Sequence, residues 1–273
     1  MDNPPPVALT IAGSDSGGGA GIQADLKTFH AFGVFGCSAI TAVTAQNTLE
    51  IAAVHILHPK MVRDQIRAVA SDIPPDAVKT GMLANAALVE TVARAIDEHS
   101  LPNYVLDPVM VSTSGHRLLD SEAEDTMRRE LIPLAAVVTP NLHEARILTG
   151  LAVEGPGDLA DAARAILDLG ARAALVKGGH LDGDEAVDLL LSEEGEHVWS
   201  RPHISTTAGH GTGCTLSAAL TAGLAAGRPL ADAAAAAVDF VTRALADAPR
   251  LGAGDGPINH FVEVRAGAEE DSE

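Results

Sequence analysis

Short apolar runs alternate with longer segments of helical periodicity along most of the chain. The runs of Val, Ile, Leu and Ala that are typical of buried strands cover 7–12, 35–45, 77–80, 104–107, 137–139 and 173–177. Apolar residues at helical spacing lie at 22–32, from Pro59 onward, and at 85–99, 122–131, 142–148 and 159–169. This alternation predicts parallel βαβ units with right-handed crossovers. We therefore expect an α/β protein with a mostly parallel central sheet and helices on both faces.

The remaining segments complete this layout. Residues 49–57 are expected to form a short strand pair, and 187–191 and 197–201 a hairpin. Two long helices close the chain, one from about Thr215 and one from Pro229. Because no linker or low-complexity stretch divides the chain, we predict one domain over 1–266, followed by a disordered acidic tail at 267–273.

The ends of the predicted strands carry most of the unusual residues. In a parallel α/β sheet, ligands bind at the carboxyl ends of the strands. These ends hold Gly13-Ser14-Asp15, Gln46-Asn47, Gly81-Met82, Asp107-Pro108, Thr139-Pro140-Asn141 and Lys177-Gly178-Gly179. The sequence thus predicts one site at this edge of the sheet.

Composition narrows the possible partners. The 273 residues include 37 acidic and 18 basic side chains, for a formal net charge of -19. Nucleic acid and anionic membranes are therefore not expected partners. The two cysteines, Cys37 and Cys214, form no disulfide framework. The N-terminal sequence MDNPPPVALTIAG lacks the basic region of a signal peptide, and the Ala-rich stretch after Leu216 is interrupted by charges, so a cytoplasmic protein is expected.

The glycine-rich stretch SDSGGGAG, at 14–21, follows the first strand. It is not a dinucleotide fingerprint, because Ile22 stands where the third glycine would be needed, and no Gly-Lys pair of a Walker A motif occurs in the chain. Glycine there permits close backbone approach to a ligand, or simply a flexible turn between strand and helix.

The stretch TPNLHE, at 139–144, puts two oxygen-bearing side chains on one side of a helical first turn. Asn141 and Glu144 are spaced by three and lie near the strand end at Asp107. Such oxygens could hold Mg²⁺ together with waters and phosphate oxygens. Alternatively, Asn141 is an N-cap and Glu144 its capping-box partner.

Two further features are suited to phosphate. Lys177 follows a strand and precedes two glycines, so it could reach a phosphate as a point charge or remain a solvated lysine. The stretch HGTGCTLSAAL, at 210–220, would aim the backbone amides from Gly211 to Cys214 at a helix N-terminus, where free N–H groups and the helix dipole bind anions. The alternative is a tight turn before a core helix, with Cys214 as a small apolar filler.

Together these stretches resemble the ribokinase-like superfamily, and within it the hydroxymethylpyrimidine/phosphomethylpyrimidine kinases of thiamine biosynthesis. The resemblance runs from about Leu9 to the helix after Pro229. It is carried by AGSDSGGGAGIQADLKTF, TAVTAQNT, VKTGML, DPVMVSTSG, TPNLHEA, VKGGH and HGTGCTLSAAL, in this order. It implies a three-layer ribokinase-like fold, ATP and Mg²⁺ as cofactors, a small aminopyrimidine substrate and a homodimer.

The resemblance also implies roles for the matching residues. Substrate contacts would come from Gln46, which hydrogen-bonds the aminopyrimidine, from Met82, which packs on its ring, and from Gly13 and Asp15 along the pocket wall. Asp107 and Glu144 would place Mg²⁺, with Asn141 nearby, and Lys177 would contact the ATP phosphates. The amides of Gly211, Thr212 and Gly213 would form an anion hole. Cys214 would stand at the position of a catalytic base, and residues 112–116 would be part of a flap.

The chain departs from the family pattern at one place, and three activities are compatible with the motifs. Members of the family often have Asn-Thr before HGTGC, whereas this chain has Ala208-Gly209, which predicts a more flexible entry to the anion hole. The alternative to the pyrimidine kinase is a pyridoxal kinase, whose relatives carry a second cysteine in the flap; 110–118 contains none. A non-catalytic pyrimidine sensor is a third reading, which the joint presence of Asp107, Glu144, Lys177 and Cys214 disfavours.

Overall fold

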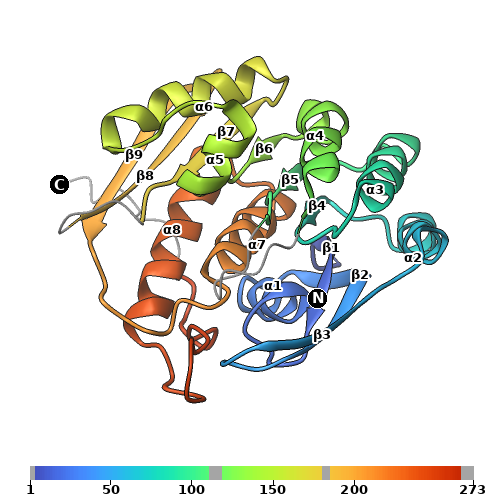
Figure 1. Ribbon diagram of the computed structural model, residues 1–273, viewed down its shortest axis with the longest axis horizontal. Coiled ribbons are helices and arrows are strands. Elements are labelled where there is room, and N and C mark those ends of the chain that lie inside the picture. Colours follow the sequence, from blue (N-terminus) through green and yellow to red (C-terminus); the bar gives the residue numbers. More distant parts are fainter. Residues whose placement is uncertain (1–3, 111–118, 180–184, 266–273) are drawn as a thin grey trace.

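A single mixed sheet forms the centre of the computed structural model, which describes residues 4–110, 119–179 and 185–265 (Figure 1). Within that part of the chain the sheet has nine strands in the order β3-β2-β1-β4-β5-β6-β7-β8-β9. Their bounds are Val7–Asp15 (β1), Phe35–Gln46 (β2), Ile51–Ile56 (β3), Ala77–Thr80 (β4), Tyr104–Leu106 (β5), Val137–Val138 (β6), Ala173–Lys177 (β7), Glu185–Ser192 (β8) and Gly195–Pro202 (β9).

The central pairs of the sheet are parallel, as predicted. Strand β1 pairs parallel with β2 and β4, and parallel pairing continues from β4 through β7. The edges are antiparallel, with β3 beside β2 and the hairpin β8–β9 beside β7. Strand order reverses between β1 and β4, which is the point where ligands bind in open α/β sheets.

Helices cover both faces of the sheet. The α-helices are Gly21–Ala31 (α1), Pro59–Asp72 (α2), Ala86–Glu98 (α3), Ser121–Glu130 (α4), Leu142–Thr149 (α5), Leu159–Asp168 (α6), Thr212–Ala225 (α7) and Leu230–Ala246 (α8). Helices α2 to α6 pack beside one another in sequence, whereas α7 packs between α1 and α8 (Figure 1). The expected α/β architecture is confirmed.

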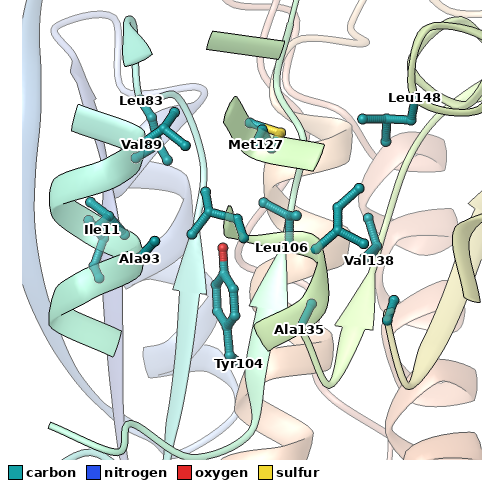
Figure 2. Packing of buried hydrophobic residues seen from close by; sticks show 14 of the residues in the cluster. Ile11, Leu83, Val89, Ala93, Tyr104, Leu106, Met127, Ala135, Val138 and Leu148 are labelled. Atoms are coloured by element: carbon teal, nitrogen blue, oxygen red, sulfur yellow. The ribbon is translucent and has the colours of Figure 1, made fainter. Parts of the chain in front are cut away.

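Each layer of helices encloses its own core. The larger core lies under α2 to α6 and includes Leu106, Met127, Val138 and the single tyrosine, Tyr104 (Figure 2). The Tyr104 hydroxyl lies 2.7 Å from Thr80 Oγ1, which provides the hydrogen bond that a buried phenol needs. Alanines make up much of the buried faces of α7 and α8, which lets α7 approach the sheet closely.

Two predicted elements differ from those observed. Residues 49–57 contain one strand, β3 at Ile51–Ile56, and not a strand pair. The Asn47 side chain accepts hydrogen bonds from the amides of Leu49 and Glu50 and closes a hairpin between β2 and β3. Helix α7 begins at Thr212, three residues before the predicted start, so Gly213 and Cys214 lie inside its first turn. The predicted flap at 112–116 and the tail at 267–273 lie outside the described residues.

A fully buried ion pair joins α1 to the sheet. Lys79 Nζ on β4 lies 2.6 Å from Asp25 Oδ1 on α1, and Thr10 Oγ1 donates to Asp25 Oδ2 at 2.6 Å. All three residues have no exposed surface. Desolvation opposes such a pair, so its stability depends on both partners being present.

Removing one partner alone is expected to destabilise the fold strongly. Lys79→Met leaves Asp25 buried and unpaired, and should lower the free energy of unfolding by about 3–5 kcal/mol in urea titrations. The double variant Lys79→Met, Asp25→Leu should be more stable than Lys79→Met. Equal destabilisation by the single and double variants would mean that the pair contributes only packing.

Candidate functional site

The N-terminus of α7 faces the strand ends at the reversal point of the sheet. This helix packs against β1, β4 and β5 on one side and against α1 on the other. Its N-cap, Gly211, has φ +84, and a side chain there would collide with the carbonyl oxygen of Gly19. Only glycine tolerates both the left-handed backbone and this close approach. The turn thereby sets the N-terminus of α7 against the glycine-rich turn after β1.

The first turn of α7 has the features that an anion-binding site requires. Thr212, Gly213 and Cys214 occupy its first three helical positions, whose N–H groups have no acceptor within the helix. Thr212 Oγ1 donates to Gly209 O at 2.8 Å and orders the entry to the turn. A β-carbon on Gly213 would lie 3.2 Å from Lys177 Nζ, so the lysine ammonium stands directly beside this turn. The Thr212 amide donates to Gly209 O at 3.3 Å. The amides of Gly213 and Cys214, the helix dipole and the Lys177 ammonium together favour a phosphate there.

Lys177 lies between two buried carboxylates. Its Nζ is 3.4 Å from Asp107 Oδ1 and 4.0 Å from Glu144 Oε2. Burial alone would lower the pKa of Lys177, but Asp107 and Glu144 outweigh it and hold that pKa above its usual value. Lys177 therefore stays charged, and the solvated lysine considered above is not what the structure shows.

Glu144 has an unusual protonation behaviour. Burial, helped by the negative charge of Asp107, raises the pKa of Glu144 to about 7, although Lys177 and the amides of Asn141 and Met110 act in the opposite direction. A second cation nearby would stabilise the ionised form of this carboxylate and lower its pKa.

The capping box predicted as one alternative for TPNLHE is present. Asn141 Oδ1 accepts from the Glu144 amide at 2.9 Å, and Glu144 Oε2 accepts from the Asn141 amide at 2.8 Å. These bonds begin α5 and fix Glu144 at the strand end. Among the described residues no group of three or more His, Cys, Asp or Glu gathers as a metal site. Any Mg²⁺ here would thus bind through Asp107 and Glu144, with its other ligands from phosphate and water.

Four residues predicted to contact substrate lie together at the ends of β1, β2 and β4. A β-carbon on Gly13 would lie 3.4 Å from Met82 Sδ, so these two residues face each other. Asp15 accepts hydrogen bonds from the amides of Gly17, Gly19 and Ala20, and thus orders the glycine-rich turn.

Gln46 is joined to this group through His210. His210 Nε2 lies 2.9 Å from Asp15 Oδ2 and 3.3 Å from the side-chain nitrogen of Gln46. Burial raises the pKa of Asp15, but the hydrogen bonds from His210 and from the turn amides outweigh it, so the net pKa lies below the usual value.

Cys214 does not behave as expected for a thiol at a helix N-terminus. A helix N-terminus commonly lowers the pKa of a cysteine toward neutrality. Instead, burial raises the pKa of Cys214 to about 11, despite the opposing effects of the Lys79 charge and of a hydrogen bond from the Gly21 amide. Desolvation of a thiolate outweighs the dipole here. Cys214 is therefore a neutral thiol at pH 7.

Four side chains of the site are not predicted from the sequence. The motif that contains His210 indicates no role for it. Ser217 donates to Asp107 Oδ2 at 3.0 Å, a contact indicated only by its place one turn after Gly213 on α7. The charge of Lys79 lowers the pKa of Cys214 and the charge of its partner Asp25 raises it. Nothing in the local sequence links these residues to Cys214.

Comparison with known proteins agrees with this geometry. A family model described as phosphomethylpyrimidine kinase matches residues 15–259. The hydroxymethylpyrimidine/phosphomethylpyrimidine kinase of Bacillus subtilis (strain 168) is 49% identical over 259 residues, which is 94% of this chain and 96% of that protein.

Solved structures give the same result. A crystal structure of the phosphomethylpyrimidine kinase from Clostridium difficile 630 is 44% identical, with a TM-score of 0.79, over 88% of this chain and 99% of that one. An ADP complex of Bacillus subtilis pyridoxal kinase is 40% identical, with a TM-score of 0.87, over 94% of this chain and 98% of that one.

The fold and the anion-binding turn define a phosphotransferase of the ribokinase-like type. More closely, the chain belongs to the phosphomethylpyrimidine kinase family. ATP is the phosphoryl donor that this assignment requires, in keeping with the ADP complex of the related kinase.

The raised pKa of Cys214 predicts slow, pH-dependent alkylation. In a Cys37→Ser background, only the thiolate of Cys214 reacts with iodoacetamide. We expect the rate constant to rise about tenfold per pH unit from pH 7 to pH 10, because the pKa lies near 11. A rate that reaches its plateau below pH 8 would show a thiolate at neutral pH and contradict the effect of burial.

Proposed function

We propose that this chain is an ATP-dependent kinase of thiamine biosynthesis that phosphorylates 4-amino-5-hydroxymethyl-2-methylpyrimidine and then converts the monophosphate to the diphosphate. One observation carries the proposal. The anion-binding turn of α7 and Lys177 lie at the carboxyl ends of the strands. Gly13, Met82 and Gln46 lie further along the same edge of the sheet. The relatives of that name, 49% identical over nearly the whole chain, support it.

The residues have distinct tasks in this proposal. In each transfer the bond between the γ-phosphorus and its bridging oxygen breaks and a bond to the acceptor oxygen forms, so the protein mainly positions the groups and neutralises charge. The amides of Gly211, Thr212 and Gly213 and the ammonium of Lys177 stabilise the transferring phosphoryl group. Such groups act on both transfers alike.

The acceptors differ between the two transfers. The first acceptor is a hydroxyl that loses a proton, whereas the second is a phosphate that is already ionised. Because Cys214 is a neutral thiol at pH 7, the structure favours a role in shaping the anion hole and contacting the hydroxyl. A role as general base requires a pKa near neutrality, and the negative phosphates of a bound nucleotide act in the opposite direction by disfavouring the thiolate.

Mg²⁺ fits the buried carboxylates of this site. Asp107 and Glu144 converge on Lys177, and Glu144 has a raised pKa that a second cation would reverse. Asn141 holds Glu144 in place through the capping box and contributes to the metal site in that way. When bound with the nucleotide, Mg²⁺ would neutralise charge on its phosphates.

A second candidate activity is phosphorylation of pyridoxal. The 40% identity and the TM-score of 0.87 to a pyridoxal kinase favour it. The absence of cysteine from 110–118 argues against it, because the flap of such relatives carries one. Pyridoxal therefore belongs in the substrate panel, with the pyrimidine as the expected better substrate.

Assembly and location are part of the proposal. Exposed apolar side chains lie on the antiparallel pair of β2 and β3 at the edge of the sheet, at Val43, Val54 and Ile56. Edge strands with exposed apolar residues readily pair with another chain, which supports a homodimer through this edge. In the described part of the chain no helix is long and apolar enough to cross a membrane. We infer a cytoplasmic protein.

The substrate assignment is tested at Gln46. Its amide offers both donor and acceptor to an aminopyrimidine, and a site built around such pairing loses affinity when the pairing group is removed. Gln46→Ala should raise the KM for the pyrimidine far more than the KM for ATP, in an assay that couples ADP release to NADH oxidation. Equal effects on both substrates, or none, would remove Gln46 from the pyrimidine pocket.

The metal assignment is tested at Glu144. Glutamine preserves the capping box, so Glu144→Gln should change the melting temperature little. It should raise the Mg²⁺ concentration needed for half-maximal rate. In the wild type this requirement should rise as the pH falls from 8 to 6, because protons compete with the metal for a carboxylate of pKa about 7. An unchanged requirement in the variant would make Glu144 a capping residue only.

A further inference from the structure

The ring of His210 stands between two polar side chains of the pyrimidine pocket. Its Nε2 is 2.9 Å from Asp15 Oδ2 and 3.3 Å from the side-chain nitrogen of Gln46. The backbone holds the ring in place, because the His210 amide donates to Gly256 O and a β-carbon on Gly19 would lie 2.6 Å from His210 Cδ2. His210 is therefore a fixed part of the pocket wall.

The contact with Asp15 determines that His210 Nε2 carries a hydrogen. The carboxylate accepts three backbone amides, and these bonds with that of His210 keep its pKa below the usual value, so it acts only as an acceptor. The 2.9 Å contact therefore requires a proton on Nε2, whatever the charge on the ring. Nε2 faces Gln46 as a donor.

A donor at Nε2 decides which end of the Gln46 amide faces the ring. Amide oxygen and nitrogen are assigned from their hydrogen bonds. With the nitrogen toward His210, two donors oppose each other at 3.3 Å. In the same arrangement Thr44 Oγ1, with one hydrogen, would have to donate both to Ser14 O and to the amide oxygen, each at 3.1 Å.

One rotation of the amide ends the opposition of two donors and relieves Thr44 Oγ1 of its double donation. Gln46 then presents its nitrogen to Thr44 Oγ1, which keeps its donation to Ser14 O, and its oxygen to His210 Nε2–H. That hydrogen is shared between Asp15 Oδ2 at 2.9 Å and the Gln46 oxygen at 3.3 Å, so a weak attraction replaces a repulsion. By the count of donors and acceptors, one N–H and one oxygen lone pair of Gln46 remain for a ligand. An aminopyrimidine offers the matching pair, a ring nitrogen that accepts and an amino group that donates.

We propose that His210, fixed by Asp15, is a positioning residue that sets substrate specificity by locking the Gln46 amide in the orientation that pairs with an aminopyrimidine. This assignment rests on the proposed function. The discriminated ligand is the 4-oxo analogue, 5-hydroxymethyl-2-methylpyrimidin-4-one, whose ring N–H and carbonyl present donor and acceptor in the reverse order. A locked amide rejects it, whereas an amide free to rotate accepts both.

The test measures binding of both pyrimidines without nucleotide by isothermal titration calorimetry. The wild type should bind the aminopyrimidine much more tightly than the 4-oxo analogue. His210→Leu removes the donor and should reduce the ratio of the two Kd values by about tenfold or more. His210→Gln, which keeps an N–H donor, should recover part of the ratio.

A second pair of variants acts on the other end of the amide and does not alter the turn before α7. Thr44→Val removes the acceptor of the Gln46 N–H and should also lower the ratio, whereas Thr44→Ser should restore it. This pair decides the question if His210→Leu does not fold.

The outcomes separate this assignment from the proposed function. A wild-type protein that binds neither pyrimidine contradicts both. A wild-type protein that prefers the aminopyrimidine, with the same ratio in His210→Leu and in Thr44→Val, contradicts the assignment alone. A loss of ATP affinity in His210→Leu with an unchanged ratio would mean that His210 only shapes the anion-binding turn.

Discussion

The close contact between Gly211 and the carbonyl of Gly19 is the constraint on which the site depends. It brings the N-terminus of α7 against the glycine-rich turn that starts α1, and a side chain at Gly211 cannot be accommodated. A second glycine with positive φ, Gly21, makes a similar approach to the carbonyl of Gly13. Because both turns lie where strand order reverses, two helix N-termini meet above the pocket, and free amides replace most of the positive side chains that a phosphate would otherwise require.

Charge inside this region is arranged as lysines paired with carboxylates. Lys177 stands between Asp107 and Glu144, and Lys79 is paired with Asp25 beneath them. Each lysine stays protonated because its carboxylates outweigh burial. The two lysines are matched by three carboxylates, so in a protein with a net charge of -19 the helix-terminal amides supply the remaining attraction for a polyphosphate. Burial also accounts for the neutral Cys214 thiol, since desolvation is the largest influence on its pKa.

The sequence predicts the strands and their ends well, because short apolar runs and turn residues are local signals. It therefore predicts the sheet edge where Gly13, Asp107 and Lys177 gather. It fails where distant residues decide the outcome. The early start of α7 depends on Gly211 packing against Gly19, and glycines at 211 and 213 weaken any local helix signal. The partners of His210 and of Lys79 lie far away in the chain. The pKa of Cys214, a half-buried side chain, depends on desolvation by groups from distant elements that no local pattern records.

The central claim is that one anion-binding turn serves two successive phosphoryl transfers. Its most direct test is Gly213→Val, which places a branched side chain beside Lys177 Nζ, where even a β-carbon would lie at 3.2 Å. Phosphorus NMR of reactions that start from the pyrimidine alcohol, or from its monophosphate, follows the two steps separately. We expect the variant to lose both steps to a similar degree while it remains folded. Loss of one step with the other at the wild-type rate would show that the two transfers use different sites, and would contradict this account.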